Sequence, residues 1–162
     1  MTEIIKNVYF DEFYLTMIRV LKLIEMFQSR KKYKLTNKKI VLFDFYLRFP
    51  LITKDEMQNK DFDARYSFFH WKPNYALYDA ILGLLSAKGL VDKEEQNDKI
   101  CYFITDNGEK ALEEMNCAYM EQLSSLEDYI VKTVANWSDK KIDEDIVEKT
   151  YLLRKDGGLS DV

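Results

Sequence analysis

The sequence contains little proline, glycine, cysteine or histidine, and each shortage excludes something. Two prolines and five glycines in 162 residues argue against long irregular loops. Two cysteines, Cys101 and Cys117, are too few for a disulfide framework and indicate a reducing, cytoplasmic compartment. No apolar run approaches the roughly 18 residues of a membrane span, so we expect no membrane partner. Acidic residues interrupt the first segment, "MTEIIKNVYFDEFY", which argues against a secretory signal.

The side chains that usually carry enzyme chemistry are scarce as well. His70 is the one histidine, so a Ser–His–Asp or Cys–His site would have to use it. Its position in an aromatic segment before Pro73 is more typical of a residue that caps or packs a helix start. The two cysteines lack the CxxC spacing of metal sites, and no glycine-rich phosphate loop follows a strand. We therefore expect a protein without a catalytic site, a metal or a cofactor.

Apolar and aromatic side chains, by contrast, are abundant. Hydrophobic residues make up 47% of the chain, and eleven tyrosines and ten phenylalanines are many for its length. This composition favours a well-packed protein with adhesive surfaces over a disordered chain. The formal net charge is −4, so any nucleic-acid site has to be a local basic cluster.

Apolar periodicity and break signals predict a mainly α-helical protein with one small β-hairpin. Thr36 or Asn37 can cap the second helix, and Pro50 helps to end it. Gly89 stops the third helix, and the loop "EEQND" separates the two strands. Thr105 or Asp106 can cap the long helix that follows. The predicted ranges are helix 8–28, helix 37–49, a loop with a short helix at 51–65, helix 73–88, strands 90–93 and 99–105, helix 107–137, and helix 142–155.

The order helix, helix, hairpin, long helix resembles a winged helix–turn–helix over about residues 40–115. The phrases "LLSAKGLV" and "YFITDNGEKALEEM", on either side of a short charged wing, carry this resemblance. A generic helical bundle with one hairpin is the alternative. The chain then divides into an N-terminal helical extension with a basic connector (1–35), a winged-helix-like core (36–106), a long helix plus a short C-terminal helix (107–155) and a flexible tail (156–162).

The third predicted helix would be the DNA-reading helix of such a fold, yet its residues do not suit that role. A helical wheel places Leu77, Ile81, Leu84 and Leu85 on its inner face. The outer face lacks the Arg, Lys, Asn and Gln side chains that mostly read bases, and the wing "DKEEQNDK" is acidic. That outer face is therefore either a protein interface or a surface covered by residues 1–35. Its members are Tyr75, Tyr78, Asp79, Leu82 and Ser86.

The predicted helix over 107–137 carries an apolar stripe along its whole length, from Leu112 to Trp137. A small winged core would cover only the first few turns of it. The remaining residues would form an exposed patch of a kind that soluble monomers usually avoid. We therefore expect the second half of this helix to dock a partner chain or a second copy. The predicted contacts are Leu126, Ile130, Val134 and Trp137.

The basic connector, "SRKKYKLTNKK" (residues 29–39), is the candidate for a nucleic-acid contact. Tyr33 lies among its cations and could stack on a base. The alternative is a solvated loop between helices whose charges balance nearby acids. The candidate residues are Arg30, Lys31, Lys32, Lys34, Lys38 and Lys39.

Several phrases together resemble the middle component of ABC-three-component systems, the Lamassu-type bacterial antiphage operons. They are "VLFDFYLRFP", the His-x-x-Pro of "HWKP", the aliphatic run "AILGLLSAKGLV", a following tyrosine-containing strand, and a long helix that ends at Trp137. The resemblance covers residues 41–137. It implies a non-enzymatic accessory subunit that bridges an SMC-like coiled-coil ATPase and an effector subunit of the same operon, which often carries a nuclease domain. A winged-helix transcription regulator that dimerises through the long helix is the alternative.

Overall fold

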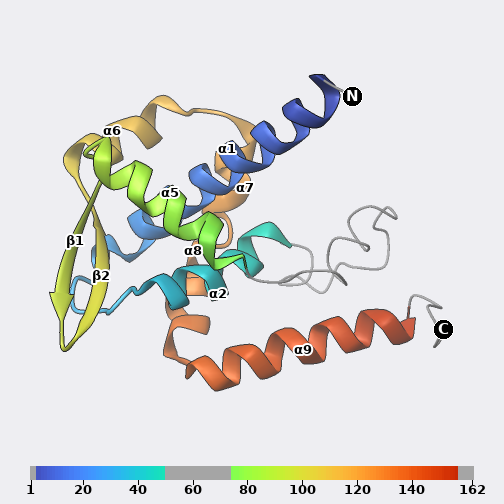
Figure 1. The fold of residues 1–162 in the computed structure, drawn as a ribbon. Helices are drawn as coiled ribbons and strands as arrows, with labels where there is room; N and C mark the ends of the chain where they lie inside the picture. The colour runs from blue at the N-terminus through green and yellow to red at the C-terminus, as the bar shows by residue number, and fades with distance from the viewer. Residues whose placement is uncertain (1–2, 50–73, 157–162) are drawn as a thin grey trace.

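The computed structural model describes the backbone of residues 3–49 and 74–156 and the side chains of residues 12–49 and 74–149. Residues 1–2, 50–73 and 157–162 lie outside the described residues. The predicted short helix at 51–65, the packing of His70 and the tail are among the predictions that fall there. The described part is mainly helical with a two-stranded antiparallel hairpin, which confirms the predicted fold at that level (Figure 1).

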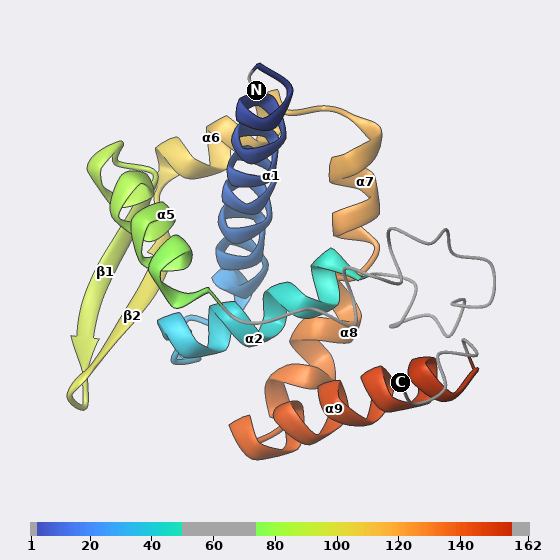
Figure 2. The same ribbon diagram turned by 45° about the vertical axis from the view of Figure 1, so that its right-hand side comes forward.

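Three helices form the first half of the core: α1 (Glu3–Met26), α2 (Asn37–Arg48) and α5 (Tyr75–Ala87). A short 3-10 helix, η1 (Phe27–Ser29), extends α1. Helix α2 is buried from Ile40 to Leu47, and it lies between α1 and the C-terminal helix α9 (Asp139–Asp156) (Figure 2). A helix that is apolar on all sides belongs inside a protein, and α2 takes that central place.

Local cap signals explain where these helices begin and end. The Thr36 side chain accepts a hydrogen bond from the Lys39 backbone N–H at 3.3 Å, so Thr36 is the cap of α2. Asn74 caps α5 in the same way, through the Leu77 N–H at 3.1 Å. Gly89 ends α5 with φ of 72°, a left-handed conformation that glycine adopts without steric cost.

The hairpin consists of β1 (Val91–Gln96) and β2 (Lys99–Ile104), paired antiparallel from Val91 opposite Ile104 to Gln96 opposite Lys99. Asn97 and Asp98 form the turn with φ of 50° and 63°, the positive values that a two-residue hairpin turn favours. The turn is therefore shorter than the predicted loop "EEQND", and β1 is longer than the predicted first strand. On its other edge β2 meets the connector, where the Tyr102 N–H donates to the Leu35 carbonyl at 3.0 Å.

The predicted single helix over 107–137 is wrong. The chain breaks it into separate pieces, and α9 follows from Asp139. Asn116, Ser125 and Thr133 stand at the breaks, where side chains that compete for backbone hydrogen bonds weaken a helix. The apolar stripe of these pieces packs onto the core instead of extending away from it. The pieces are α6 (Asp106–Glu114), α7 (Ala118–Ser124), α8 (Glu127–Lys132) and η3 (Val134–Asn136).

Candidate functional site

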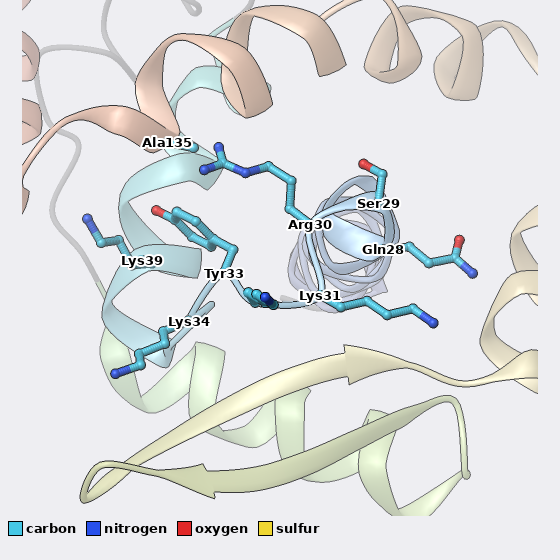
Figure 3. Close-up of a pocket in the computed structure, with 9 residues that line it drawn as sticks. Gln28, Ser29, Arg30, Lys31, Tyr33, Lys34, Lys39 and Ala135 are labelled. Carbon is cyan, nitrogen blue, oxygen red and sulfur yellow. The ribbon is translucent and has the colours of Figure 1, made fainter.

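The basic connector lines an open groove between η1, α2 and the segment around Ala135 (Figure 3). The groove has a volume of about 920 Å³. All of the predicted cations except Lys38 line it, and Figure 3 shows Lys34 and Lys39 on one side of the connector and Lys31 pointing to the other. The lining residues are Gln28, Ser29, Arg30, Lys31, Lys32, Tyr33, Lys34, Lys39 and Ala135.

Two of the predicted cations are engaged inside the chain. Arg30 donates from Nη1 to the Val131 carbonyl oxygen at 2.8 Å. Lys39 donates from Nζ to the Trp137 carbonyl oxygen at 3.3 Å and pairs with Asp139 Oδ1 at 2.5 Å. Both side chains therefore fasten the connector to residues 131–139.

Tyr33 does not offer a free face for stacking on a base. Its ring stacks on Phe27, with 4.7 Å between centroids, and the Arg30 guanidinium lies over it at 5.0 Å. Burial raises the pKa of its hydroxyl to about 12, while the Arg30 charge opposes and the Asp139 charge supports that shift. The hydroxyl is buried without a hydrogen-bond partner among the described residues. Tyr33 thus packs the connector against the core, and the predicted base contact does not fit its place.

The other four predicted cations remain available at the surface. Lys31, Lys32 and Lys34 are exposed and form no ion pair with any residue that the structure describes. Lys38 keeps 54% of its side chain exposed and lies 3.7 Å from Asp139. The six predicted cations therefore fall into two groups. Arg30 and Lys39 bond within the chain, and four lysines face solvent.

The outer face predicted for the third helix is divided in α5: Tyr75 and Asp79 are exposed and Ser86 is half-buried, whereas Tyr78 and Leu82 face inward. Tyr78 and Leu82 are buried, and together with Ile81 and Leu85 they form the stripe that packs against α1 and α2. Leu77 and Leu84, predicted to face inward, are only half-buried. For Tyr78 and Leu82, the second of the two predicted alternatives therefore holds: helix α1 of the N-terminal segment helps to cover them.

A buried polar network joins the same three helices. Arg19 donates from Nε and Nη2 to the two carboxylate oxygens of Asp44, at 2.8 and 3.2 Å, and Tyr78 donates its hydroxyl to Asp44 as well. Burial and then the Asp44 charge raise the pKa of Tyr78, so the hydroxyl stays a donor. Burial lowers the pKa of Arg19, but the charge and hydrogen bond of Asp44 together with those of Tyr119 outweigh it, and the pKa is raised. The lone carboxylate in the apolar run "VLFDFYL" was the sequence signal for this site, and the sequence predictions missed it.

The predicted docking stripe is core in this fold. Leu126, Ile130 and Val134 have exposed fractions of 1%, 0% and 0%. Trp137 is half-buried, and Lys141 lies over its ring at 4.6 Å. The exposed patch expected from these residues is therefore absent from the described part of the chain, because the helix breaks fold it inward. Of all the predicted interface residues, Trp137 and Tyr75, which is 44% exposed, keep accessible surface.

The sequence profile of one protein family matches residues 14–153, from within α1 to within α9. That family is the ABC-three component (ABC-3C) system Middle Component 2. The chain belongs to this family. The predicted resemblance to a middle component of such systems is thereby confirmed at the level of the family. No curated protein and no solved structure matches the chain.

The described residues of this middle component show neither a metal-binding cluster nor a membrane-spanning helix. They contain no group of three or more His, Cys, Asp or Glu side chains placed to hold a metal ion. Within the same residues, no helix has the length and apolar character needed to cross a bilayer. The absence of enzymatic activity stays a prediction.

Proposed function

We propose that this middle component is a non-enzymatic scaffold in a bacterial antiphage complex of Lamassu type. In this proposal it joins an SMC-like ATPase to an effector subunit from the same operon, in the cytoplasm. The observation that carries the proposal is the family match over residues 14–153, since a middle component belongs to a system of several components. The match includes the connector and the segments that fold back over the core.

The order of the elements supports a winged-helix-like core for this scaffold. Helices α2 and α5, the hairpin and α6 follow one another as in that architecture, and Thr36 forms an isolated bridge with Cys101 beside β2. We propose that the family uses this shape as a protein framework. Helix α5 supports that choice, since its Tyr78 and Leu82 pack inside the chain and its exposed Asp79 would repel a phosphate.

A transcription regulator that dimerises through a long helix gains no support. Such a regulator needs a continuous helix with an apolar face left over for a second copy. The corresponding segment is divided into α6, α7 and α8, and Ile130 and Val134 are buried within the chain. The scaffold is therefore the function that we carry forward, with Tyr75 and Trp137 as the predicted partner contacts that retain accessible surface.

Co-expression of the three proteins tests the scaffold directly. With an affinity tag on the ATPase, we expect the effector to be recovered when the middle component is present and to be lost when its gene is omitted. A double variant, Tyr75→Ala with Trp137→Ala, should weaken recovery while its circular dichroism spectrum stays that of the wild type. The proposal is contradicted if the tagged ATPase recovers the effector without the middle component. It is also contradicted if the ATPase recovers neither the middle component nor the effector when all three are present.

A further inference from the structure

The connector concentrates positive charge in a chain that is acidic as a whole. The protein has 24 Lys and Arg against 28 Asp and Glu, yet the segment 30–39, "RKKYKLTNKK", contains no acid. Arg30 and Lys39 are used to hold the connector in place. Lys31, Lys32 and Lys34 are exposed without a counter-charge among the described residues, and Lys38 keeps 54% of its side chain exposed although it lies 3.7 Å from Asp139. Such a cluster in an acidic chain presents an anion-attracting surface.

We propose that Lys31, Lys32, Lys34 and Lys38 form a binding site for the phosphate backbone of duplex nucleic acid, without sequence specificity. The site goes beyond the scaffold function and does not depend on it, since every one of its residues lies in this chain.

The connector holds these lysines on an ordered backbone. The Tyr33 N–H donates to the Arg30 carbonyl at 2.8 Å, and the Leu35 carbonyl accepts from Tyr102 in β2 at 3.0 Å. Arg30 adds the bond to Val131 on the opposite side. Because the backbone is already fixed, binding orders only the lysine side chains and not the connector itself.

The charges around the groove also favour an anionic ligand. Asp139 is the acid that lies beside Lys38 and Lys39. Burial raises the pKa of its carboxyl, but the Lys39 hydrogen bond and the charges of Lys39, Lys38 and Lys99 outweigh this and lower it. The carboxylate is thus held ionised by a surplus of cations, and Lys99 adds a further positive charge from the start of β2.

The chemistry of the surface favours phosphate over an acidic protein partner. Lysine is depleted in the cores of protein interfaces, which rely on exposed apolar anchors. The large hydrophobic side chains exposed in the described part of the chain are absent from the groove lining: Tyr14, Leu15, Tyr75, Ile100 and Val147. Phosphate contacts, by contrast, are made by flexible cationic side chains such as these.

Apart from its cations, the groove offers few free groups that could read a base sequence. Gln28 is the amide in its lining, and that amide donates to Glu109. Beside the groove, the Asn37 amide donates to Asp79. Tyr33 has no free face for stacking. Duplexes of different sequence should therefore bind with equal affinity, and the affinity should depend strongly on salt.

The test compares two triple variants of the full chain with equal charge. Lys31→Gln/Lys32→Gln/Lys34→Gln removes the exposed lysines of the connector. Lys88→Gln/Lys93→Gln/Lys110→Gln removes three exposed lysines, one at the C-cap of α5, one in β1 and one in α6. Fluorescence anisotropy with a labelled duplex is measured from about 50 to about 200 mM salt, where phosphate contacts weaken markedly. Circular dichroism and thermal unfolding establish that both variants fold like the wild type.

We expect the wild type to bind and the connector variant to lose about one unit of the salt slope for each lysine, about three in all. The control variant should keep the wild-type slope. No binding by the wild type, or an equal loss in both variants, overturns the site. If the connector variant binds duplex like the wild type but no longer recovers a partner in the co-expression assay, the lysines serve an acidic protein surface and the proposal is wrong.

Discussion

Removal of the Asp44 carboxylate should be among the most destabilising single changes in the described core. Asp44→Ala leaves the Arg19 guanidinium, 4% exposed, without its counter-charge and deprives the Tyr78 hydroxyl of its acceptor. Breaking a buried ion pair from one side costs about 3–5 kcal/mol, and an unsatisfied buried hydroxyl adds about 1–3 kcal/mol. Typical domains are stable by about 5–15 kcal/mol, so the variant should lose a large share of its stability.

Urea unfolding followed by circular dichroism measures this loss. The matched control is Asp79→Ala, which removes an exposed carboxylate bonded to Asn37 and should cost less than about 1 kcal/mol. Replacing the whole network, Arg19→Met/Asp44→Leu/Tyr78→Phe, leaves no buried charge and should be less destabilising than Asp44→Ala alone. The reasoning is refuted if Asp44→Ala costs no more than the control, or if the triple replacement costs as much as the single one.

Three further predictions test the core, the fold-back of the stripe and the anchoring of the connector. Gly108→Ala places a Cβ atom 2.2 Å from the Leu90 carbonyl oxygen and should lower the free energy of unfolding by about 1–3 kcal/mol. Gly83→Ala, with nothing within 4 Å of the new Cβ atom, should raise the free energy of unfolding by up to about 1 kcal/mol. A thermal unfolding midpoint that shifts in the same direction for both variants contradicts this prediction. Ile130→Ala empties a fully buried position and should cost about 2–5 kcal/mol in urea unfolding, while a cost below about 1 kcal/mol would mean that the residue is not core. The lowered pKa of Asp139 implies stability that is present above the ordinary value of 3.8 and is lost as pH falls below it. The wild type should therefore exceed Asp139→Asn in free energy of unfolding by under about 1 kcal/mol at neutral pH, as for a partly exposed pair, and this difference should disappear in acid. A difference that persists or grows in acid contradicts the assignment.

Short-range signals made much of the fold predictable. Thr36 marks the start of α2, and Gly89 marks the end of α5, because a cap or a left-handed residue acts within one turn of the helix. The hairpin was recognisable from alternation in "KICYFIT", although its turn at Asn97 and Asp98 was shorter than predicted. Family membership was predictable too, because it rested on phrases that lie within the matched range.

Long-range contacts explain what could not be predicted. The apolar spacing continues through Asn116 and Thr133, so it predicts one helix. These residues have a weak helix preference, and tertiary packing determines whether the helix continues or breaks there. Asp44 pairs with Arg19 across 25 positions, and nothing in the sequence distinguishes that arginine from the other basic residues. The cations of the connector likewise looked equivalent until residues 131–139 were seen to fold against some of them and leave Lys31 exposed.

The bonds that fix the connector also determine when it becomes ordered during synthesis. Arg30 bonds to Val131, 101 positions later, and Lys39 bonds to Trp137, 98 positions later. Contacts at such separation form late, because the entropy of closing the intervening loop has to be overcome first. The connector therefore leaves the ribosome early and lacks its bonds to Val131 and Trp137 until residues 131–139 have emerged. A nascent chain that stalls before Val131 carries the same lysines without these two bonds, and the groove is complete only once Ala135 has emerged.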